Sequence, residues 1–347
     1  MVLTLKLNKG QAEKARRFLI EKGWLNTSRV IGRTPDRYII LPLAEKANTK
    51  LLLKKFEDAK LEQKNLQLLP PKTGNLKQIL KKLVPEKHLD KIIRSYDIIG
   101  DIAILEIPNQ LNSLGNTIAH NLQRALPSIK TVLAKAGSVS EEFRIRPLKY
   151  LGGENKTETI HKEHGVILHL DVTKVYYSPR TSGERLRIAR SVKQNEDVLV
   201  MFAGIGVYAL VIAKVQPLCH VWAIEKNPVA VKFMEQNIRA NRVGHIVTAL
   251  EGDVRTKVPE LGMAFDRIIM PYPKESENFL DLAFQFVKPK GTIHHYAFLH
   301  EDKVENHIKK IENIAKKFGK EIEIQNWFKV ASYAPKVWKY AFDVLVE

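Results

Sequence analysis

The stretch from Asp197 to Asn241 constrains the fold more than any other part of the chain. A short apolar run, 198–201 (VLVM), leads into a glycine turn, 203–206 (AGIG), and then into an apolar segment long enough for a helix. A second apolar run, 221–224 (VWAI), ends on Glu225. This order predicts strand, glycine turn, helix, strand and acid. Because a right-handed crossover joins parallel strands, the turn and the acid should lie side by side at the carboxyl edge of a sheet.

Two ligand classes use that geometry, dinucleotides and S-adenosylmethionine. Glycines let a backbone approach a ligand closely, and an acid about twenty residues further on can accept hydrogen bonds from both ribose hydroxyls. A dinucleotide site asks for a third glycine where this chain has Ala209, a replacement that the fingerprint tolerates. The glycine spacing therefore leaves NAD open, as it does a turn that only tightens an α/β sheet.

The residues after Glu225 favour the methyl donor. An Asn-Pro pair follows the acid, a helical pattern then carries Asn237 and Asn241, and a GDV triplet, 252–254, follows a third apolar run. This order resembles class I methyltransferases. The resemblance implies that Glu225 holds the ribose of the donor, that Asp253 holds its adenine amino group, and that the glycine turn faces its methionine part.

Charge is unevenly distributed along the 347 residues, whose formal net charge is +18. Residues 1–140 hold 25 Lys and Arg against 12 Asp and Glu, whereas the remainder hold 31 against 26. The excess positive charge lies outside the predicted donor domain and suits a polyanionic partner. A lysine-rich surface of the kind common in heat-adapted proteins explains the same composition without any partner.

Three classes of protein are disfavoured by composition. No apolar run approaches the roughly 20 residues of a membrane span, and the N-terminus lacks the apolar core of a signal peptide, so we expect a cytoplasmic protein with no membrane partner. The single cysteine, Cys219, cannot form an internal disulfide. His161 and His164 lack the spacing and partners of a metal site, and we expect no metal.

The predicted fold class is α/β, with a class I (Rossmann-like) methyltransferase domain preceded by two small α/β domains. The first domain is expected over 1–68, with a helix at 9–22 and a strand at 37–42. Two prolines in 69–72 (LPPK) mark a joint, because proline suits neither a helix interior nor a central strand. A middle domain is expected over 69–172 and the methyltransferase domain over 173–347.

Further elements are expected within these domains. The middle domain should hold a helical pattern at 76–95, two strands around a Gly-Asp turn at 100–101, a helix at 116–126, a strand at 129–134, and a core of Ile99, Ile102, Ile104 and Ile107. The C-terminal end should hold a helix at 279–287, a strand at 292–298, a helix at 303–318, and strands at 322–330 and 340–346 joined by 332–335.

The segment 143–190 carries chemistry outside the donor fold. Paired strands are expected at 159–162 and 166–171, followed by an arginine-bearing turn and the start of a helix. Arg144 and Arg146 are two residues apart, so on a strand they would share a face. The side chains expected to converge are those of Arg144, Arg146, Arg180, Glu184 and Arg185.

Short motifs in this segment occur together with 96–101 (YDIIGD): FRIR at 143–146, TIHKE at 159–163, YSPR at 177–180 and GER at 183–185. Together they resemble the archaeal and eukaryotic tRNA guanine-37 methyltransferase family over essentially the whole chain, and its archaeal branch in particular. Members of that branch methylate N1 of guanosine 37, C7 of the wyosine precursor 4-demethylwyosine, or both. The resemblance implies a monomer that binds the folded body and the anticodon loop of tRNA, and a role in wyosine biosynthesis.

The resemblance also assigns roles to single residues. Glu184 matches the proposed general base, and Arg144 matches the arginine that steadies the guanine oxygen, with Arg146 as the fallback. Arg185 matches a position that contacts the donor. Tyr177, Tyr272 or Phe202 would stack on the target base, and Arg180 would bind the substrate. The implied donor-binding set is Arg185, Phe202, Ala203, Gly204, Gly206, Glu225, Lys226, Asp253, Val254 and Pro271.

Ordinary structural roles are the alternatives. Glu184 and Arg185 are also what the first turn of a helix often carries. Arg144 or Arg146 would then bind phosphate, and Arg180 would do the same or pair with Glu184. His294 and His295 lie on a predicted buried strand and are expected to be structural.

The sequence departs from the family after the strand predicted at 265–269. Most members carry an N-L-P or N-P-P-Y motif there, whereas this chain reads MPYPK at 270–274. With Pro273 in the place of the N-L-P proline, the asparagine position falls on Pro271. A side-chain amide is then missing where N1 specificity is read, which keeps both N1 and C7 methylation open.

The reaction asks for a carboxylate and a cation. N1 of guanine carries a proton that must leave as the methyl arrives, and a carboxylate within hydrogen-bond reach can take it. Negative charge builds on O6, which a guanidinium stabilises. On C7, Glu184 would take a proton from carbon after methyl addition. The rival functions are a catalytically weak tRNA-binding protein and a small-molecule methyltransferase, the second disfavoured by the basic first 140 residues.

Overall fold

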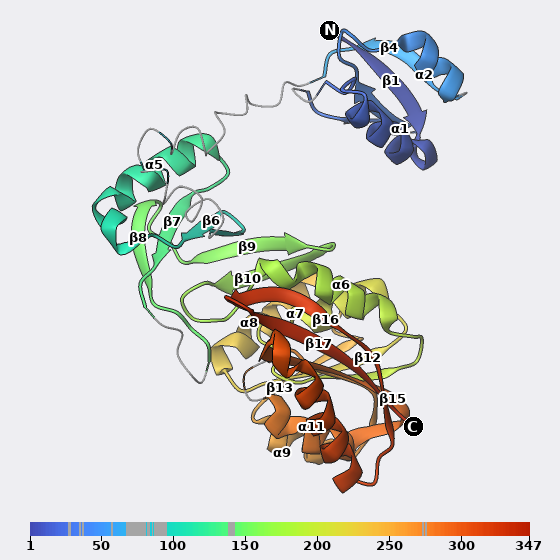
Figure 1. The fold of residues 1–347 in the computed structure, drawn as a ribbon. Coiled ribbons are helices and arrows are strands. Elements are labelled where there is room, and N and C mark those ends of the chain that lie inside the picture. Colours follow the sequence, from blue (N-terminus) through green and yellow to red (C-terminus); the bar gives the residue numbers. More distant parts are fainter. Residues whose placement is uncertain are drawn as a thin grey trace. The chain divides into compact units, whose positions relative to one another are not determined.

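The computed structural model describes the chain apart from residues 27, 28, 35, 37, 57, 67–80, 82, 83, 85, 87–95, 138–142, 273 and 275 (Figure 1). The expected joint at 69–72 and nearly all of the helical pattern at 76–95 lie outside the described residues. The chain divides into two compact units. One spans Met1–Lys82 with Arg124–Leu126, and the other spans Leu83–Gln123 with Pro127–Glu347.

The first unit is a four-stranded antiparallel sheet, in the order β2-β3-β1-β4, with two helices. Its elements are β1 Val2–Asn8, α1 Lys9–Glu21, β2 Gly32–Arg33, β3 Tyr38–Pro42, α2 Thr49–Lys55 and β4 Lys60–Lys64. The side chain of Asn8 caps α1 by accepting from the Gln11 amide, and Gly23 follows the helix with φ +64°. Leu5, Leu7 and residues of α1 and α2 form its core.

The second unit begins with a four-stranded sheet, in the order β5-β6-β7-β8. Its elements are β5 Asp97–Ile99, β6 Ile102–Leu105, the 3-10 helix η1 Asn109–Leu114, α5 Gly115–Ala125, β7 Thr131–Lys135 and β8 Leu148–Gly153. The expected strands around Gly100, which has φ +59°, are confirmed. Ile99, Ile102 and Ile104 are buried, whereas Ile107 is only half-buried. The three buried isoleucines belong to a core shared with the later sheet.

The expected hairpin after it is present as β9 Glu158–Glu163 and β10 Val166–Asp171. The free edge of β10 is completed by two side chains of helix α8, Pro228–Asn241. The Asn237 amide bonds the backbone N–H and C=O of His169, and the Asn241 amide bonds those of Ile167. The helix therefore pairs with the strand through its asparagines.

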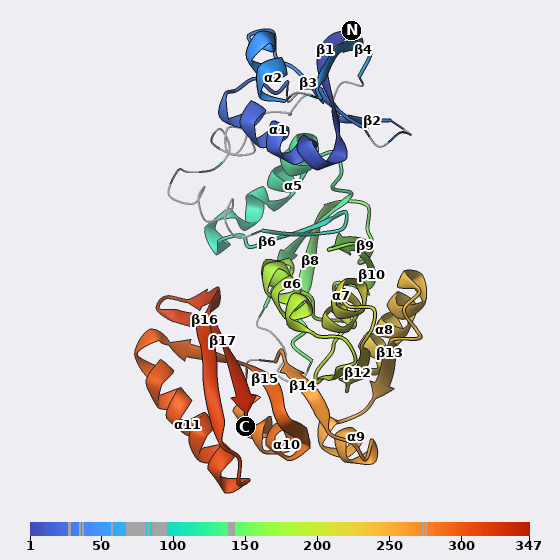
Figure 2. The same cartoon turned by 90° about the vertical axis from the view of Figure 1, so that its right-hand side faces the viewer.

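A seven-stranded sheet, in the order β13-β12-β11-β14-β15-β17-β16, forms the rest of the second unit (Figures 1 and 2). Its strands are β11 Asp197–Val200, β12 His220–Glu225, β13 Val247–Glu251, β14 Phe265–Met270, β15 Val287–His300, β16 Ile322–Ala334 and β17 Val337–Val346. The helices are α6 Ser182–Ser191, α7 Val207–Val215, α8, α9 Val254–Glu260, α10 Leu280–Phe286 and α11 Val304–Lys317. The first five strands in this order, from β13 through β12, β11 and β14 to β15, are parallel to one another. Strands β17 and β16, drawn in red in Figure 2, are added to this sheet in antiparallel pairing.

The alternation of strand β11 explains the layers on the two faces. Val198 and Val200 pack in one core cluster with α7 and α8, whereas Leu199 and Met201 pack in another with α9, α10 and α11. A central parallel strand is buried on both faces, so its residues are apolar throughout.

Two elements near the C-terminus have bounds that differ from those expected from the sequence. Strand β15 begins at Val287 rather than at 292, passing through Pro289 and Gly291, and the terminal hairpin turns at 335–336, where Lys336 has φ +58°.

Candidate functional site: a methyl-donor cleft beside a cationic, aromatic pocket

The turn after β11 has positive φ angles, a backbone conformation that few residue types other than glycine adopt. Phe202, Gly204 and Gly206 have φ +54°, +57° and +84°. A Cβ on Gly206 would lie 2.8 Å from the Met234 Cγ, so glycine is required both by the conformation and by the packing of α8. A phenylalanine with positive φ is an uncommon strained residue of the kind found at ligand sites.

Glu225, at the end of β12, binds this turn. Its carboxylate accepts from the Gly204 amide at 2.8 Å and from the Asn227 amide at 2.8 Å. Burial raises the pKa of Glu225, while the backbone N–H groups of Asn227, Gly204 and Lys226 act in the opposite direction. The predicted juxtaposition of turn and acid is therefore present, with the carboxylate held where hydroxyl groups of a ligand could replace backbone donors.

The next turn along the edge carries Asp253. Its side chain caps α9 by accepting from the Arg255 amide at 2.9 Å, and it lies 3.8 Å from the Lys226 ammonium. The Asp253 side chain keeps 44% of its exposure, whereas Val254 is buried. The structure brings the predicted residues Glu225, Lys226, Asp253 and Val254 together at the carboxyl ends of β12 and β13.

Tyr272 connects the donor turn to a second group of predicted residues. Its ring centroid lies 5.3 Å from that of Phe202 and 5.8 Å from the guanidinium carbon of Arg144. The Arg144 guanidinium also lies over the rings of Tyr176, at 4.7 Å, and Phe298, at 5.6 Å. Arginine and aromatic faces are groups that stack on heterocyclic bases, and we call Arg144 with these three rings the aromatic slot.

The expectation that Arg144 and Arg146 share a face of a strand is wrong. Residues 144–147 are not in a strand, β8 begins at Leu148, and Arg144 has φ +57°. Pro147 lacks a backbone donor for a ladder and restricts the residue before it. Arg146 is half-buried and does not join the aromatic slot.

Glu184 lies in the first turn of α6 and is only 7% exposed. Arg187 donates to both of its oxygens at 2.8 Å, and the Tyr296 hydroxyl donates to Oε1. Arg187 also pairs with Asp343 at 2.6 Å. The carboxylate is thus fixed in orientation from two sides, as a proton acceptor in a dry site must be.

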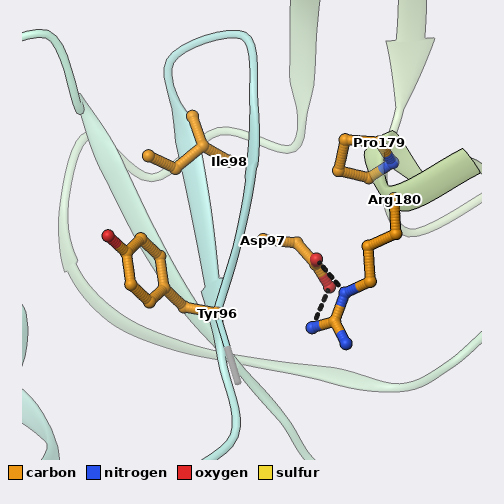
Figure 3. A pocket seen from close by; sticks show the side chains of 5 residues that line it. All are labelled: Tyr96, Asp97, Ile98, Pro179 and Arg180. Atoms are coloured by element: carbon orange, nitrogen blue, oxygen red, sulfur yellow. Dashed lines mark hydrogen bonds and ion pairs between the residues drawn. The ribbon is translucent and has the colours of Figure 1, made fainter. Parts of the chain in front are cut away.

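Arg180 pairs with a different carboxylate from the one expected, while its binding of substrate or phosphate stays a prediction. Its Nε and Nη2 donate to the Asp97 carboxylate at 2.7 and 3.3 Å, joining β5 to the 3-10 helix η2 Pro179–Thr181. Figure 3 shows this pair facing a shallow pocket lined also by Tyr96, Ile98 and Pro179. The alternative pairing of Arg180 with Glu184 is therefore wrong.

Arg185 is buried within a network of its own. Its guanidinium donates to the Glu163 carboxylate at 2.6 and 2.5 Å and to the Ser178 carbonyl at 3.0 Å. It lies 5.3 Å from the ring of Tyr177, whose hydroxyl donates to Glu163 at 2.7 Å. These contacts hold the 176–181 turn, and a contact of Arg185 with the methyl donor stays a prediction.

Sequence reasoning did not find Lys339. This lysine of β17 is 8% exposed, donates to the Pro271 carbonyl at 3.3 Å and lies 4.4 Å from the ring centroid of Tyr296. Burial, and next the nearby Arg144, lower the pKa of Lys339 to about 7, against the opposing effect of Glu184. The available signal was a lysine inside the apolar run VWKYAF at 337–342.

His294 and His295 of β15 are buried, as expected. His294 bridges Arg267 and Asp343, and burial lowers its pKa. His295 contacts His307, and burial lowers the pKa of His295 too. Among the described residues, no cluster of ligands suits a metal ion and no helix is long and apolar enough to cross a membrane.

The glycine turn after β11, the half-buried acid at the end of β12 and the aspartate after β13 define a class I methyltransferase domain that uses S-adenosylmethionine. Family models described as the tRNA methyltransferase 5 N-terminal domain, the TYW2 N-terminal domain and the TRM5/TYW2 methyltransferase domain match residues 4–51, 76–157 and 159–324. The chain is 35% identical over 347 residues to the tRNA (guanine(37)-N(1))-methyltransferase Trm5b of Pyrococcus abyssi, covering 100% of this chain and 99% of that one. The chain belongs to the TRM5/TYW2 methyltransferase family.

Two solved structures match essentially the whole chain, and a third matches most of it. Trm5b from Pyrococcus abyssi has a TM-score of 0.71 at 32% identity, with 100% of both chains covered. A complex of aTrm5 with tRNALeu has a TM-score of 0.70 at 32% identity, covering 99% of this chain and 100% of that one. TYW2 of P. horikoshii in complex with MeSAdo has a TM-score of 0.66 at 32% identity, covering 78% of this chain and 97% of that one.

Proposed function

We propose that this protein transfers a methyl group from S-adenosylmethionine to the purine at position 37 of tRNA. One observation carries the proposal: the ring of Tyr272 lies beside both Phe202 of the donor turn and the guanidinium of Arg144. The donor turn and the aromatic slot are therefore adjacent. The full-length relatives named as tRNA (guanine(37)-N(1))-methyltransferases support the choice of substrate.

The donor-binding residues fit S-adenosylmethionine chemically. Glu225 offers a fixed carboxylate for ribose hydroxyls, Asp253 offers a half-exposed carboxylate for an amino group, and the turn at 202–206 offers backbone close to the ligand. When bound, the donor supplies an electrophilic methyl group. We infer that Lys226, Val254 and Pro271 complete this site with Ala203, Gly204 and Gly206.

Glu184 and Arg144 would act on the base. We infer that Glu184 accepts the proton from N1; its buried carboxylate is held in orientation by Arg187 and Tyr296. Arg144 stabilises the charge that builds on O6. Tyr272 contacts Arg144, so we assign it to binding the flipped base, whose removal from the stack costs a few kcal/mol. Tyr177 contacts Glu163 and Arg185 instead, and its stacking on the base stays a prediction. Orientation of base and donor supplies much of the rate.

N1 of guanosine 37 is our first choice of methylated atom. Two relatives named for N1 methylation match 99–100% of this chain, including the first unit. Methylation at C7 is the second candidate, because a relative named tRNA (guanine(37)-N(1))/4-demethylwyosine(37)-methyltransferase Taw22, from Nanoarchaeum equitans, is 34% identical over 64% of this chain, and because Pro271 replaces the expected asparagine.

One experiment separates these products. The enzyme is incubated with unmodified tRNA and with tRNA carrying 4-demethylwyosine, and the nucleosides are identified by mass spectrometry. A gain of one methyl on guanosine supports N1 transfer, and one on the tricyclic base supports C7 transfer. A gain of an aminocarboxypropyl group would contradict the methyl assignment, since two relatives at 33–34% identity are named aminocarboxypropyltransferases. Donor binding without transfer would indicate a tRNA-binding protein.

The remaining features are assigned in the same framework. We infer that the first domain, 1–68, docks on the folded body of tRNA, while the middle domain, 69–172, and the methyltransferase domain, 173–347, close on the anticodon loop. The charge surplus of residues 1–140 supports this division. We further infer a cytoplasmic monomer. Gel filtration tests the monomer, and a tRNA affinity that does not fall with salt would contradict the docking role.

A further inference from the structure

Lys339 and Arg144 are two cations of this site whose side chains contact aromatic rings. The part of the chain that the structure describes forms no ion pair to either side chain. Arg144 lies on the rings of Tyr176, Phe298 and Tyr272, and Lys339 lies on the ring of Tyr296. Aromatic faces attract a cation while leaving its N–H groups available.

The backbone fixes where the lysine points. In the antiparallel register of β15 and β17, Lys339 lies opposite Phe298, one of the rings beneath Arg144. Its Nζ donates to the carbonyl of Pro271, the residue before Tyr272, at 3.3 Å. An ammonium has three donors, and the Pro271 carbonyl uses one of them.

The titratable and charged groups around Lys339 belong to three segments of the chain: the loop before β8, helix α6 and strand β15. Arg144 and Arg185 disfavour its protonation, Glu184 favours it, and Tyr296, whose pKa burial raises, packs against it from β15. A buried ammonium between a guanidinium and a single carboxylate is costly unless a further electron-rich group joins it. Such a group is the oxygen of a purine losing its N1 proton.

We propose that Lys339 is a further residue of the substrate pocket, which donates a hydrogen bond to the 6-oxygen of the target purine and shares with Arg144 the negative charge that develops there. This inference rests on the proposed function. It applies to N1 methylation of guanosine, where loss of the N1 proton places negative charge on the oxygen; the tricyclic base has no N1 proton, so there Lys339 would only hold the carbonyl oxygen in place. Anchoring on the Pro271 carbonyl places the ammonium before the base arrives, so little reorganisation is needed.

The test compares Lys339→Met, which keeps the length without charge, with Lys339→Arg, which keeps the charge. Lys329→Met, on the neighbouring strand β16, is the matched control because Lys329 lies over Trp338 and pairs with the exposed Glu301. Single-turnover methyl transfer is measured with saturating S-adenosylmethionine and tRNA. We expect Lys339→Met to slow transfer about 100-fold, as loss of one oxyanion donor does, and Lys339→Arg to recover at least about tenfold of that loss.

A substrate change distinguishes contact with the oxygen from a structural role. Sulfur accepts hydrogen bonds weakly, so tRNA with 6-thioguanosine at position 37 should show a much smaller difference between the wild type and Lys339→Met. Coupling of the two changes supports direct contact, whereas additive effects overturn it. Donor affinity, measured by calorimetry, should change less than about twofold.

The pH dependence gives a second readout. The lysine is charged below its pKa, so the wild-type rate should lose this contribution at alkaline pH, whereas the Arg variant should not, because arginine stays charged. A Met variant as fast as the wild type, or a Met variant that loses donor binding as well, overturns the inference. Absence of methyl transfer by the wild type would instead refute the proposed function.

Discussion

Glu184→Gln removes the proposed base with the smallest change in shape. A general base contributes about 100- to 10,000-fold, so we expect the rate of methyl transfer to fall by that factor, which corresponds to about 3–5 kcal/mol of transition-state stabilisation. The amide oxygen can still accept from the Tyr296 hydroxyl, and Arg187 keeps Asp343 at 2.6 Å. Loss of one charge-assisted contact should therefore cost about 1–3 kcal/mol of folding free energy.

The assay separates chemistry from folding and binding. Single-turnover transfer of tritiated methyl to tRNA reports the chemical step, calorimetry reports donor affinity, and thermal denaturation reports stability. Glu235→Gln, an exposed change on α8, is the matched control and should leave all three unaltered. The Gln variant should bind the donor as the wild type does, because Glu184 does not touch Glu225 or the turn at 202–206.

A Gln variant that transfers methyl within about threefold of the wild-type rate would refute Glu184 as the base. A slow variant that also fails to bind the donor would point to a structural role for the carboxylate.

Three further predictions follow from the site and its support. Asp253→Asn keeps the cap of α9 but loses the acceptor pair for an amino group, so the donor dissociation constant should rise about tenfold by calorimetry, and an unaltered constant removes Asp253 from the site. Gly206→Ala should lower the unfolding free energy by about 2 kcal/mol in urea, since its φ is +84° and its Cβ would meet Met234; equal stability would contradict this. Burial raises the pKa of Asp343, but bonds from His294 and Arg187 outweigh it and lower that pKa from 3.8 to about 2. The wild type should therefore carry about 2 kcal/mol of stability that is present above pH 3.8 and lost as the pH falls toward 2, and Asp343→Asn should abolish this difference in acid denaturation.

The donor cleft could be predicted because its determinants are local. The turn at 203–206 and Glu225 are separated by one crossover, and both strand ends follow from the handedness of that unit. The helix with Asn237 and Asn241 was expected in its place, although its pairing with β10 was not. Spacing along the chain does not show which backbone a side chain amide will meet.

The proposed substrate site could be predicted only in part, because contacts between residues that are far apart in the sequence form it. Lys339 meets Pro271 across 68 residues, and Arg180 meets Asp97 across 83. The positive φ of Arg144 cannot be inferred from residue type, since arginine rarely adopts it. The strand expected at Arg144 and Arg146 was therefore wrong. The sequence shows a lysine, Lys339, inside an apolar run, but it does not show which group the lysine would contact.

The asparagines of α8 have a consequence for the solution behaviour of the hairpin. An unpaired strand edge is a template on which a second chain can add by backbone hydrogen bonding, and natural proteins protect such edges. Here two carboxamides occupy the donors and acceptors of Ile167 and His169, so β10 offers no free ladder there. Replacing both asparagines by leucine would keep the helix and uncover the edge, making self-association through β10 more favourable.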